Sequence, residues 1–366
     1  MATHGILATL ANALIASTLC ACSSIGPPTV ERDRLDYGSA IADSWKQQTL
    51  LNIVKLRYGD FPVFLEVAQV IAGYQLESTV GAGFNAANNS SFGPLAFFGG
   101  SAAAQGKYTD RPTLIYAPLT GNDFLKKLMT PIPPSAVLFM LQSGYAADLV
   151  LPLAVNSING VSNESRRGMS RAADPDFPRV VQLLRELQLA DAVQIRIERP
   201  KGDTETTILV FPPSENPQVA ARSAEIGRIL RVKPGVRELG VYYGGYSGKG
   251  DEISMLTRSM LQIMLELGAI VQVPAADVAS GKAAPGAVEI QPGESPATQA
   301  PVLLNVFSGE TPPREAHVAV PYRGRWFWIA NTDIRSKYTF ASVMLLFSIS
   351  DTGVRGNAPV VTVPAN

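Results

Sequence analysis

The sequence has few of the residues that catalytic and metal-binding sites usually require. Two cysteines, Cys20 and Cys22, and two histidines, His4 and His317, occur in 366 residues. Structural zinc sites take about four ligands from cysteine and histidine side chains, so the sequence offers too few for such a site. A Ser–His–Asp triad would have to use His317, which lies in an alternating, strand-like segment. We therefore expect no metal, no cofactor and no enzymatic activity.

The chain also lacks an excess of charge of either sign. It carries 31 basic and 31 acidic residues, with no run of like charge. Because nucleic-acid binding depends on a concentration of lysine and arginine, we expect no nucleic-acid partner. Hydrophobic residues make up 46% of the chain and charged residues 17%, which is typical of a protein that folds around a sizeable core.

The amino-terminal apolar stretch, "GILATLANALIASTLCAC", is too short for a stable membrane span and has no lysine or arginine before it. It closes in "LCAC", which resembles the lipobox of bacterial lipoproteins: a leucine, a small residue before the cleavage and the cysteine that receives lipid. Ala21 precedes Cys22, so we expect a signal peptide over 1–21 and lipidation at Cys22. The alternative is a plain secretory signal with two incidental cysteines.

The lipobox resemblance implies a destination for the protein. Ser23 and Ser24 follow Cys22 with no aspartate, which in bacterial lipoproteins implies sorting to the outer membrane. Removal of Cys20 and acylation of Cys22, for example with palmitate, would leave no free thiol and no disulfide. Each buried methylene adds about 0.8 kcal/mol, so several acyl chains anchor a protein firmly. We expect a lipid-anchored protein of the outer membrane that faces the periplasm.

Apolar spacing divides the mature chain into segments. Helical spacing predicts an amphipathic helix that ends at Gly59, and Pro62 marks a change to strand alternation. Mixed helical and strand patterns follow, which predicts an α+β fold of one or two domains with a long protruding amphipathic β-hairpin. The expected segments are a tether over 22–36, the amphipathic helix over 37–62, the long hairpin over 63–117, an α+β domain over 118–350 with a flexible loop over 275–301, and a tail over 351–366.

The hairpin segment has the most regular pattern. From Ala68 to Phe84, seventeen residues, even positions are mostly apolar and odd positions mostly polar, and an arm from Ala96 to Tyr108 repeats the alternation. Ordinary strands have about five or six residues. The turn residues of "NAANNSSFGP" separate the arms. The even positions expected to insert or dock are Tyr74, Leu76, Val80, Phe84, Phe98 and Tyr108.

A hairpin folded about Ser91 would place Phe84 opposite Phe98 and Tyr74 opposite Tyr108. The two aromatic levels are then about 33 Å apart along the strand. With a tilt of about 40° this becomes roughly 25 Å, the height of the apolar band of outer-membrane strands. A membrane hairpin is one interpretation. A hairpin packed on protein is another, because glycine and alanine dominate the apolar face, and a disordered loop is the third.

The glycine-rich stretch Gly244–Gly250 and the segment after it have structural explanations and do not match a catalytic motif. "GGYSGKG" (Gly244–Gly250) misses the spacing of a phosphate-binding loop, and Lys249 occupies the position where a nucleophile elbow around Ser247 needs glycine. We expect a turn between a strand and a helix there. The following "DEISMLTRSMLQIMLELGAIVQVP" predicts an amphipathic helix running into a strand, with its methionines in the core.

Aromatic and cationic residues cluster in "RGRWFWIANTD". We expect edge-strand packing here, with a partner surface for a glycan or peptide as the less favoured alternative. Its residues are Arg323, Arg325, Trp326 and Trp328. The carboxylate pairs Asp174/Asp176 and Asp251/Glu252 are at loop or helix-start positions, where helix capping explains them.

Three blocks of the sequence resemble uncharacterised lipoproteins of Gram-negative bacteria: "LLNIVKLRYGDFPVFL", "DRPTLIYAPLTGNDFLKKLMTPIPP" and "YRGRWFWIANTDIRSKYTF". The resemblance implies no activity. With the hairpin, it leads us to expect a structural or assembly component of a cell-envelope complex, in the sharper version an oligomeric pore of shared hairpins. The alternatives are a monomeric lipoprotein that binds a protein or peptidoglycan, and an envelope hydrolase using Ser247 or a carboxylate pair.

Overall fold

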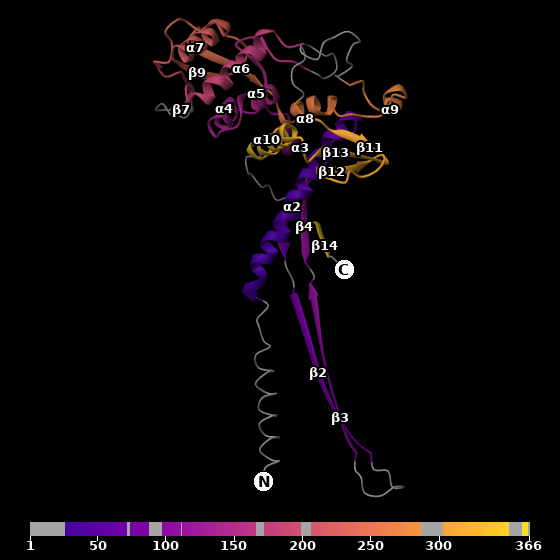
Figure 1. Ribbon diagram of the computed structural model, residues 1–366. Helices are drawn as coiled ribbons and strands as arrows, with labels where there is room; N and C mark the ends of the chain where they lie inside the picture. Colours follow the sequence, from indigo (N-terminus) through magenta and orange to yellow (C-terminus); the bar gives the residue numbers. More distant parts are fainter. Residues whose placement is uncertain are drawn as a thin grey trace. The chain divides into compact units, whose positions relative to one another are not determined.

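The computed structural model divides the chain into two compact units (Figure 1). The first unit consists of residues 1–42, 65–118 and 357–366, and the second of residues 43–64 and 119–356. Helices and sheets occur together, so the α+β fold class predicted from the sequence is confirmed. The structure describes residues 26–71, 74–87, 97–110, 112–165, 172–198, 206–286, 303–350 and 361–364.

Strands form most of the first unit. A three-stranded sheet has the order β1-β4-β14, and β2 and β3 form a separate two-stranded ribbon. β14 pairs antiparallel with β4, from Val361 opposite Tyr116 to Pro364 opposite Thr113. The loose tail expected over 351–366 is therefore wrong at 361–364, where the chain completes a sheet. The strands are β1 (Phe64–Ile71), β2 (Tyr74–Ala87), β3 (Phe97–Asp110), β4 (Thr113–Leu119) and β14 (Val361–Pro364).

Helix α2 (Gly26–Arg57) begins well before the expected start at Tyr37. The tether expected over 22–36 is therefore wrong from Gly26 onward. Pro27 and Pro28 do not prevent the helix, because in a first turn their missing N–H groups leave no intrahelical bond unmade. The end of the helix agrees with the expectation, since Gly59 follows it with φ +76°, a conformation that favours glycine.

The two ends of α2 differ in burial. Leu35, in the first unit, is 66% exposed, whereas Leu50, Ile53 and even Asn52, in the second unit, are completely buried. The Asn52 side chain is satisfied by the backbone N–H and carbonyl of Val63, at 2.9 and 2.7 Å. Leu51 and Lys55, on the opposite side of the helix, stay partly exposed, so the carboxyl-terminal turns of α2 have one buried face as far as Arg57.

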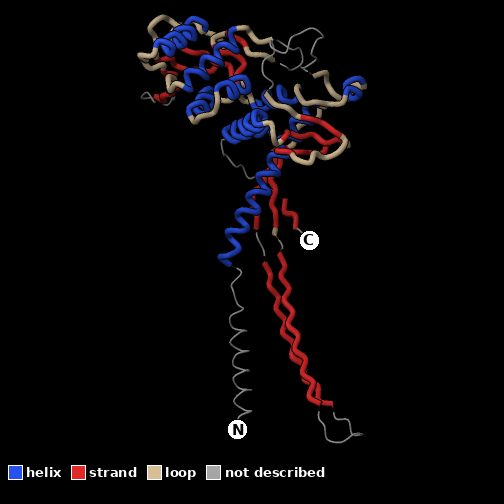
Figure 2. The backbone as a smooth tube through the Cα atoms, viewed as in Figure 1, coloured by secondary structure: helices blue, strands red, loops and turns tan. Residues whose placement is uncertain are grey.

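A six-stranded sheet and four helices form one part of the second unit (Figure 2). The strand order is β6-β5-β10-β9-β8-β7, and alternate residues such as Leu239 and Val241 are buried under the helices. The elements are α4 (Pro134–Gln142), α5 (Ala147–Ala154), β5 (Val155–Ile158), β6 (Val161–Ser162), α6 (Asp176–Leu189), β7 (Gln194–Glu198), β8 (Thr206–Val210), α7 (Pro217–Ile229), β9 (Glu238–Tyr243) and β10 (Glu252–Thr257).

The glycine-rich stretch Gly244–Gly250 joins two parallel neighbours, β9 and β10. Parallel strands usually need a crossover of about a dozen residues or more, so this short connection must turn sharply. Gly244 and Gly248 have φ values of +154° and +80°, which allow the turn. We expected this turn to join a strand to a helix. It joins two strands instead, because residues 252–257 form a strand.

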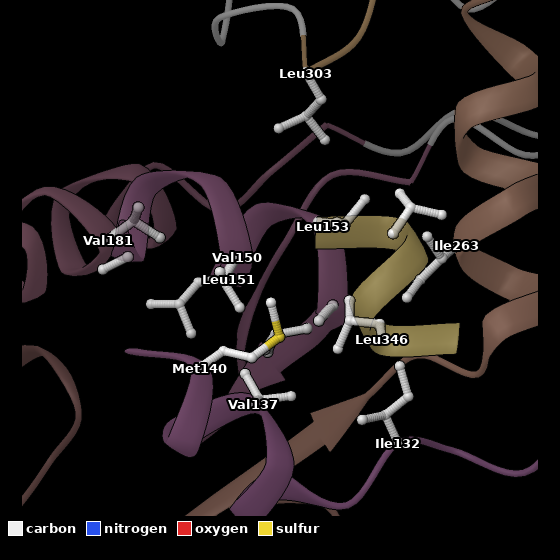
Figure 3. Packing of buried hydrophobic residues seen from close by; sticks show 14 of the residues in the cluster. Ile132, Val137, Met140, Val150, Leu151, Leu153, Val181, Ile263, Leu303 and Leu346 are labelled. Atoms are coloured by element: carbon white, nitrogen blue, oxygen red, sulfur yellow. The ribbon is translucent and has the colours of Figure 1, made fainter. Parts of the chain in front are cut away.

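The other part of the second unit is a three-stranded sheet of order β11-β13-β12 with further helices. Figure 3 shows Val137 and Met140 of α4, Leu151 of α5 and Leu346 of α10 within the shared core. The elements are α3 (Asn122–Met129), α8 (Met260–Ala269), α9 (Ala275–Ala279), β11 (Phe307–Gly309), β12 (Ala316–Tyr322), β13 (Arg325–Ala330) and α10 (Ile334–Ser350). The flexible loop expected over 275–301 is wrong at its start, because residues 275–279 form helix α9. Residues 287–301 lie outside the described residues.

Candidate functional site: a long ribbon and an aromatic sheet

Strands β2 and β3 pair along their whole length, 14 residues in each. The pairing runs from Tyr74 opposite Asp110 to Ala87 opposite Phe97. The expected register, with Tyr74 opposite Tyr108, is therefore wrong by a slip of two residues. The reason lies in the sequence of the arms: small residues dominate the centre, and strands of that kind specify their register weakly.

A slip of two residues preserves the two faces of the ribbon. Even positions remain opposite even positions, so all six residues selected from the sequence lie at positions of one face: Tyr74, Leu76, Val80, Phe84, Phe98 and Tyr108. The aromatic residues are now diagonal neighbours rather than direct pairs, because Phe84 is opposite Gly100 and Tyr108 is opposite Leu76. The two aromatic levels remain, each slanted across the ribbon.

The observed register changes the arrangement of charge on the other face. The expected register put Gln75 opposite Lys107, whereas in the structure Glu77 is directly opposite Lys107. Residues directly opposite on antiparallel strands have Cβ atoms about 4.5–5.5 Å apart, and opposite charges there stabilise the pairing. Cys22, the expected lipidation site, lies outside the described residues.

The aromatic sheet β11-β13-β12 separates the residues of the candidate partner surface. Phe327 and Ile329 on β13 are completely buried, so their neighbours Trp326 and Trp328 face the opposite side of the sheet, where they are half-buried. Phe307 of β11 lies against Trp328, with ring centroids 6.0 Å apart and an angle of 30° between the rings. The two tryptophans therefore belong to one outer face, where Phe307 partly covers Trp328.

Arg323 lies in the turn between β12 and β13. It has φ +48°, a left-handed conformation that is uncommon for arginine, and Gly324 follows with φ +77°. The Arg323 guanidinium lies over the ring of Tyr58, 5.1 Å from its centroid, and donates to the Asp60 carboxylate at 3.0 Å. The Tyr322 hydroxyl donates to the same carboxylate. These contacts favour the left-handed turn.

Tyr58 joins this cluster to helix α9. Its hydroxyl donates to the Asp277 carboxylate at 2.8 Å, and its ring meets that of Tyr322 edge-on, with centroids 5.5 Å apart. Burial is the main cause that raises the pKa of Tyr58 to about 12, and the hydrogen bond to Asp277 adds to it. The sequence gives no sign of this cluster, because nothing local in "RYGD" indicates a partner more than two hundred residues away.

The structure therefore divides the four residues expected to form one surface. Arg323 and Arg325 are both close enough to Tyr58 to lower its pKa, against the larger effects of burial and Asp277. Trp326 and Trp328 belong to the other face. Arg325 also forms an ion pair of 3.6 Å with Glu310, which is highly exposed. The four residues are divided because successive side chains of a strand point to opposite faces of the sheet.

A largely apolar cavity lies between helices α4–α7 and the six-stranded sheet. Its volume is about 40 Å³, and it is bounded by apolar side chains and by Gln142 and Gln188. The Gln188 amide donates to the carbonyls of Leu141 and Tyr145, at 2.7 and 2.8 Å, and its oxygen accepts from Arg185 at 2.8 Å. Gln188 is thus used to hold the helices together.

The residues considered for hydrolase chemistry have separate structural surroundings. The Ser247 hydroxyl accepts from the backbone N–H of Lys249 at 3.2 Å, as in a tight turn. His317 lies edge-on to Phe340, 6.3 Å between centroids, and burial, followed by nearby Lys46 and Lys337, lowers its pKa. No hydrogen bond joins Ser247 to His317 in the described ranges.

The carboxylate pairs also have local roles. Asp174 accepts from the backbone N–H of Asp176 at 3.0 Å in a turn just before α6. The N-cap of α6 is Pro175, without a side-chain cap, so the expected capping role is wrong. Glu252 is the first residue of β10 and faces Lys249 at 3.5 Å, so the helix capping expected for Asp251 and Glu252 is wrong. Among the residues with described positions, no group of three or more histidine, cysteine or carboxylate side chains could hold a metal ion.

None of the helices in the described ranges is both long and apolar enough to cross a membrane. Comparison of the chain with known protein families, with curated proteins and with solved structures finds no match.

Proposed function

We propose that this chain is a lipid-anchored outer-membrane protein, facing the periplasm, that acts as a structural component of a cell-envelope complex. In this proposal Cys22 carries the lipid anchor. Several copies contribute their β2–β3 ribbons to one oligomeric pore, and the second unit forms the periplasmic body. The protein performs no catalysis and needs no cofactor.

The ribbon is the observation that carries the proposal. It has 14 consecutive residue pairs, and it belongs to a different compact unit from the α+β core. An isolated two-stranded hairpin is marginally stable in water, so a ribbon of this length needs a further partner. The alternation of its faces suits a boundary between an apolar and a polar environment.

Pooling of several copies follows from the physics of the bilayer. Lipid cannot satisfy the backbone N–H and carbonyl groups at the edges of a two-stranded ribbon. Closed bacterial pores of strands begin at about eight strands, so about four or more copies would be needed.

The first test measures the native mass of the detergent-extracted mature protein. The comparison variant has residues 72–110 replaced by a short Gly-Ser linker. We expect a ring of about four or more copies for the full chain and a monomer for the variant. A monomer in both cases would reject the shared pore. Palmitate labelling of the full chain and of Cys22→Ala tests the anchor separately, because only the anchored form should carry label.

The outer face of the aromatic sheet favours a second candidate function. Half-buried Trp326 and Trp328 are on one face, a composition typical of surfaces that bind glycans or peptides. In this alternative the protein is a monomeric lipoprotein that docks on peptidoglycan or on an envelope protein. Sedimentation with isolated peptidoglycan distinguishes the two functions: Trp326→Ala should reduce binding in the docking function and change nothing in the pore function.

A further inference from the structure

Both outer edges of the ribbon are open in the described part of the chain. β2 and β3 form a sheet of two strands, and no third strand is paired with either of them there. An open edge presents a row of unpaired N–H and carbonyl groups, which pairs readily with another strand. In a pore of pooled ribbons, these two edges are where neighbouring copies would meet.

The two strands carry complementary charge at the same level. Glu77 is the single charged residue of β2, whereas β3 contains Lys107 and, at its end, Asp110. Glu77 and Lys107 are directly opposite in the register and occupy odd positions, on the polar face. Each ribbon therefore has an acidic residue on one edge strand and a basic residue on the other.

Membrane sidedness restricts how two copies can pair. If every copy is anchored in the same leaflet, all β2 strands run in the same direction through the membrane, and all β3 strands in the opposite direction. Antiparallel pairing between copies is then available only to β2 of one copy with β3 of the next. Such head-to-tail contacts close into rings when the rotation between copies is constant.

We propose that β2 of each copy pairs with β3 of the next, which places Glu77 beside Lys107 of the neighbouring copy. The inference rests on the proposed pore and names its interface. A small stagger between copies moves the two residues from directly opposite to diagonal positions, which long side chains still bridge. Glutamate and lysine then alternate around the polar face at one level of the ring.

The decisive experiment mixes two charge-reversal variants. The E77K chain has a positive charge on both strands, and the K107E chain has a negative charge on both, so each has a repulsive pair within its own ribbon. Alone, each variant should form fewer rings, by roughly 1.5- to 5-fold for each interface. When they are mixed before assembly, contacts between unlike copies become attractive, while the repulsion inside each ribbon remains. Mixing should therefore restore the rings.

Native mass after extraction separates the outcomes. Rings restored by mixing, with both variants in one particle, support the β2–β3 interface. Full-size rings for each variant alone, or no recovery on mixing, would overturn it and leave the proposed pore intact. Absence of rings in the unmodified chain would instead reject the pore. Glu215→Lys, on an exposed residue of the second unit, is the matched control and should leave the rings unchanged.

A cysteine pair provides a second readout that does not depend on charge. In separate chains, Glu77→Cys and Lys107→Cys should cross-link only to each other when mixed. Gly106→Cys, on the other face of β3, is the control and should link several-fold less. Equal cross-linking at Lys107 and Gly106, or links between two Glu77→Cys chains, would contradict the proposed interface. The unmodified chain gives the background.

Discussion

The β2–β3 ribbon and the six-stranded sheet use strands in contrasting ways. Each strand of the ribbon has 14 residues and, within the part of the chain that the structure describes, pairs only with the other. The strands of the sheet have six residues or fewer, yet their inward residues are buried under helices, for example Leu239, Ile253 and Met255. The sheet has its own core, whereas many positions on the apolar face of the ribbon are glycine or alanine.

The contrast shows that extensive pairing and independent stability are different properties. In the sheet, hydrogen bonds between strands accompany the burial of large apolar side chains, and burial contributes most of the stabilisation. In the ribbon, glycine and alanine occupy many positions of the apolar face, so the same number of backbone bonds is accompanied by little apolar area. Four measurements can test this difference.

The largest effect should come from the core of the second unit. Phe340 on α10 is completely buried, so Phe340→Ala should lower the free energy of unfolding by about 3–5 kcal/mol. Tyr338 on the same helix is 56% exposed, and Tyr338→Ala should change it by less than about 0.5 kcal/mol. Denaturant titration of both variants checks this. Similar losses in both would contradict the placement of α10.

A smaller effect concerns alkaline pH. Tyrosine in an unfolded chain titrates near pH 10, whereas the pKa of Tyr58 in the folded protein is about 12. As pH rises, the unfolded state loses this proton first, so the stability contributed by Tyr58 is complete below about pH 10 and is lost between pH 10 and 12 at about 1.4 kcal/mol per pH unit.

Tyr58→Phe removes that dependence. Its stability should therefore fall less steeply above pH 10 than that of the unmodified protein, in unfolding titrations made at several pH values. Tyr338→Phe serves as the control, because Tyr338 is largely exposed, and its curve should follow the unmodified one. A Tyr58→Phe curve with an unchanged slope would count against the buried hydrogen bond to Asp277.

The third effect concerns the connection between β9 and β10, where Gly248→Ala should lower the free energy of unfolding by about 1–2 kcal/mol. Gly248 has φ +80°, so Gly248→Ala forces a side chain into the left-handed region. Gly245 has no positive φ and open space around it, so Gly245→Ala should be neutral or slightly stabilising. Thermal unfolding of the two variants side by side gives the difference. Equal melting temperatures would mean that the crossover does not need this conformation.

The smallest effect should come from removal of the ribbon itself. Replacing residues 72–110 with a Gly-Ser linker should change the unfolding free energy of the second unit by less than about 0.5 kcal/mol, because its core does not depend on those residues. The measurement is the denaturant unfolding of the second unit in monomeric protein. A large loss would show that the two regions are not independent in stability.

Sequence pattern predicted much of the fold because local signals were strong. Helical spacing that stops at Gly59 predicted where α2 ends, and alternation on both sides of a run of turn residues predicted the paired strands β2 and β3. The prediction was wrong for β10. Its apolar residues Ile253 and Met255 are followed directly by those of α8, so the whole stretch has the pattern of one helix. Only pairing with β5 and β9 makes that stretch a strand.

The candidate site was less accessible to sequence reasoning. The alternation of the ribbon gave its two faces, but a register that differs by two residues has the same faces, so the pattern could not choose between them. The aromatic and cationic cluster at 323–328 can be recognised in the sequence, but its residues lie on two sides of a sheet. Tyr58 and Asp277 meet only through tertiary folding.

Pairing of β14 with β4 also sets an order of events during folding. In the chain, β14 comes after the whole of the second unit, so the sheet β1-β4-β14 cannot close until all of that sequence has been made. Closing so long a loop is slow compared with forming a hairpin from neighbouring residues. The sheet β1-β4-β14 is therefore among the last parts of the chain to reach its final form.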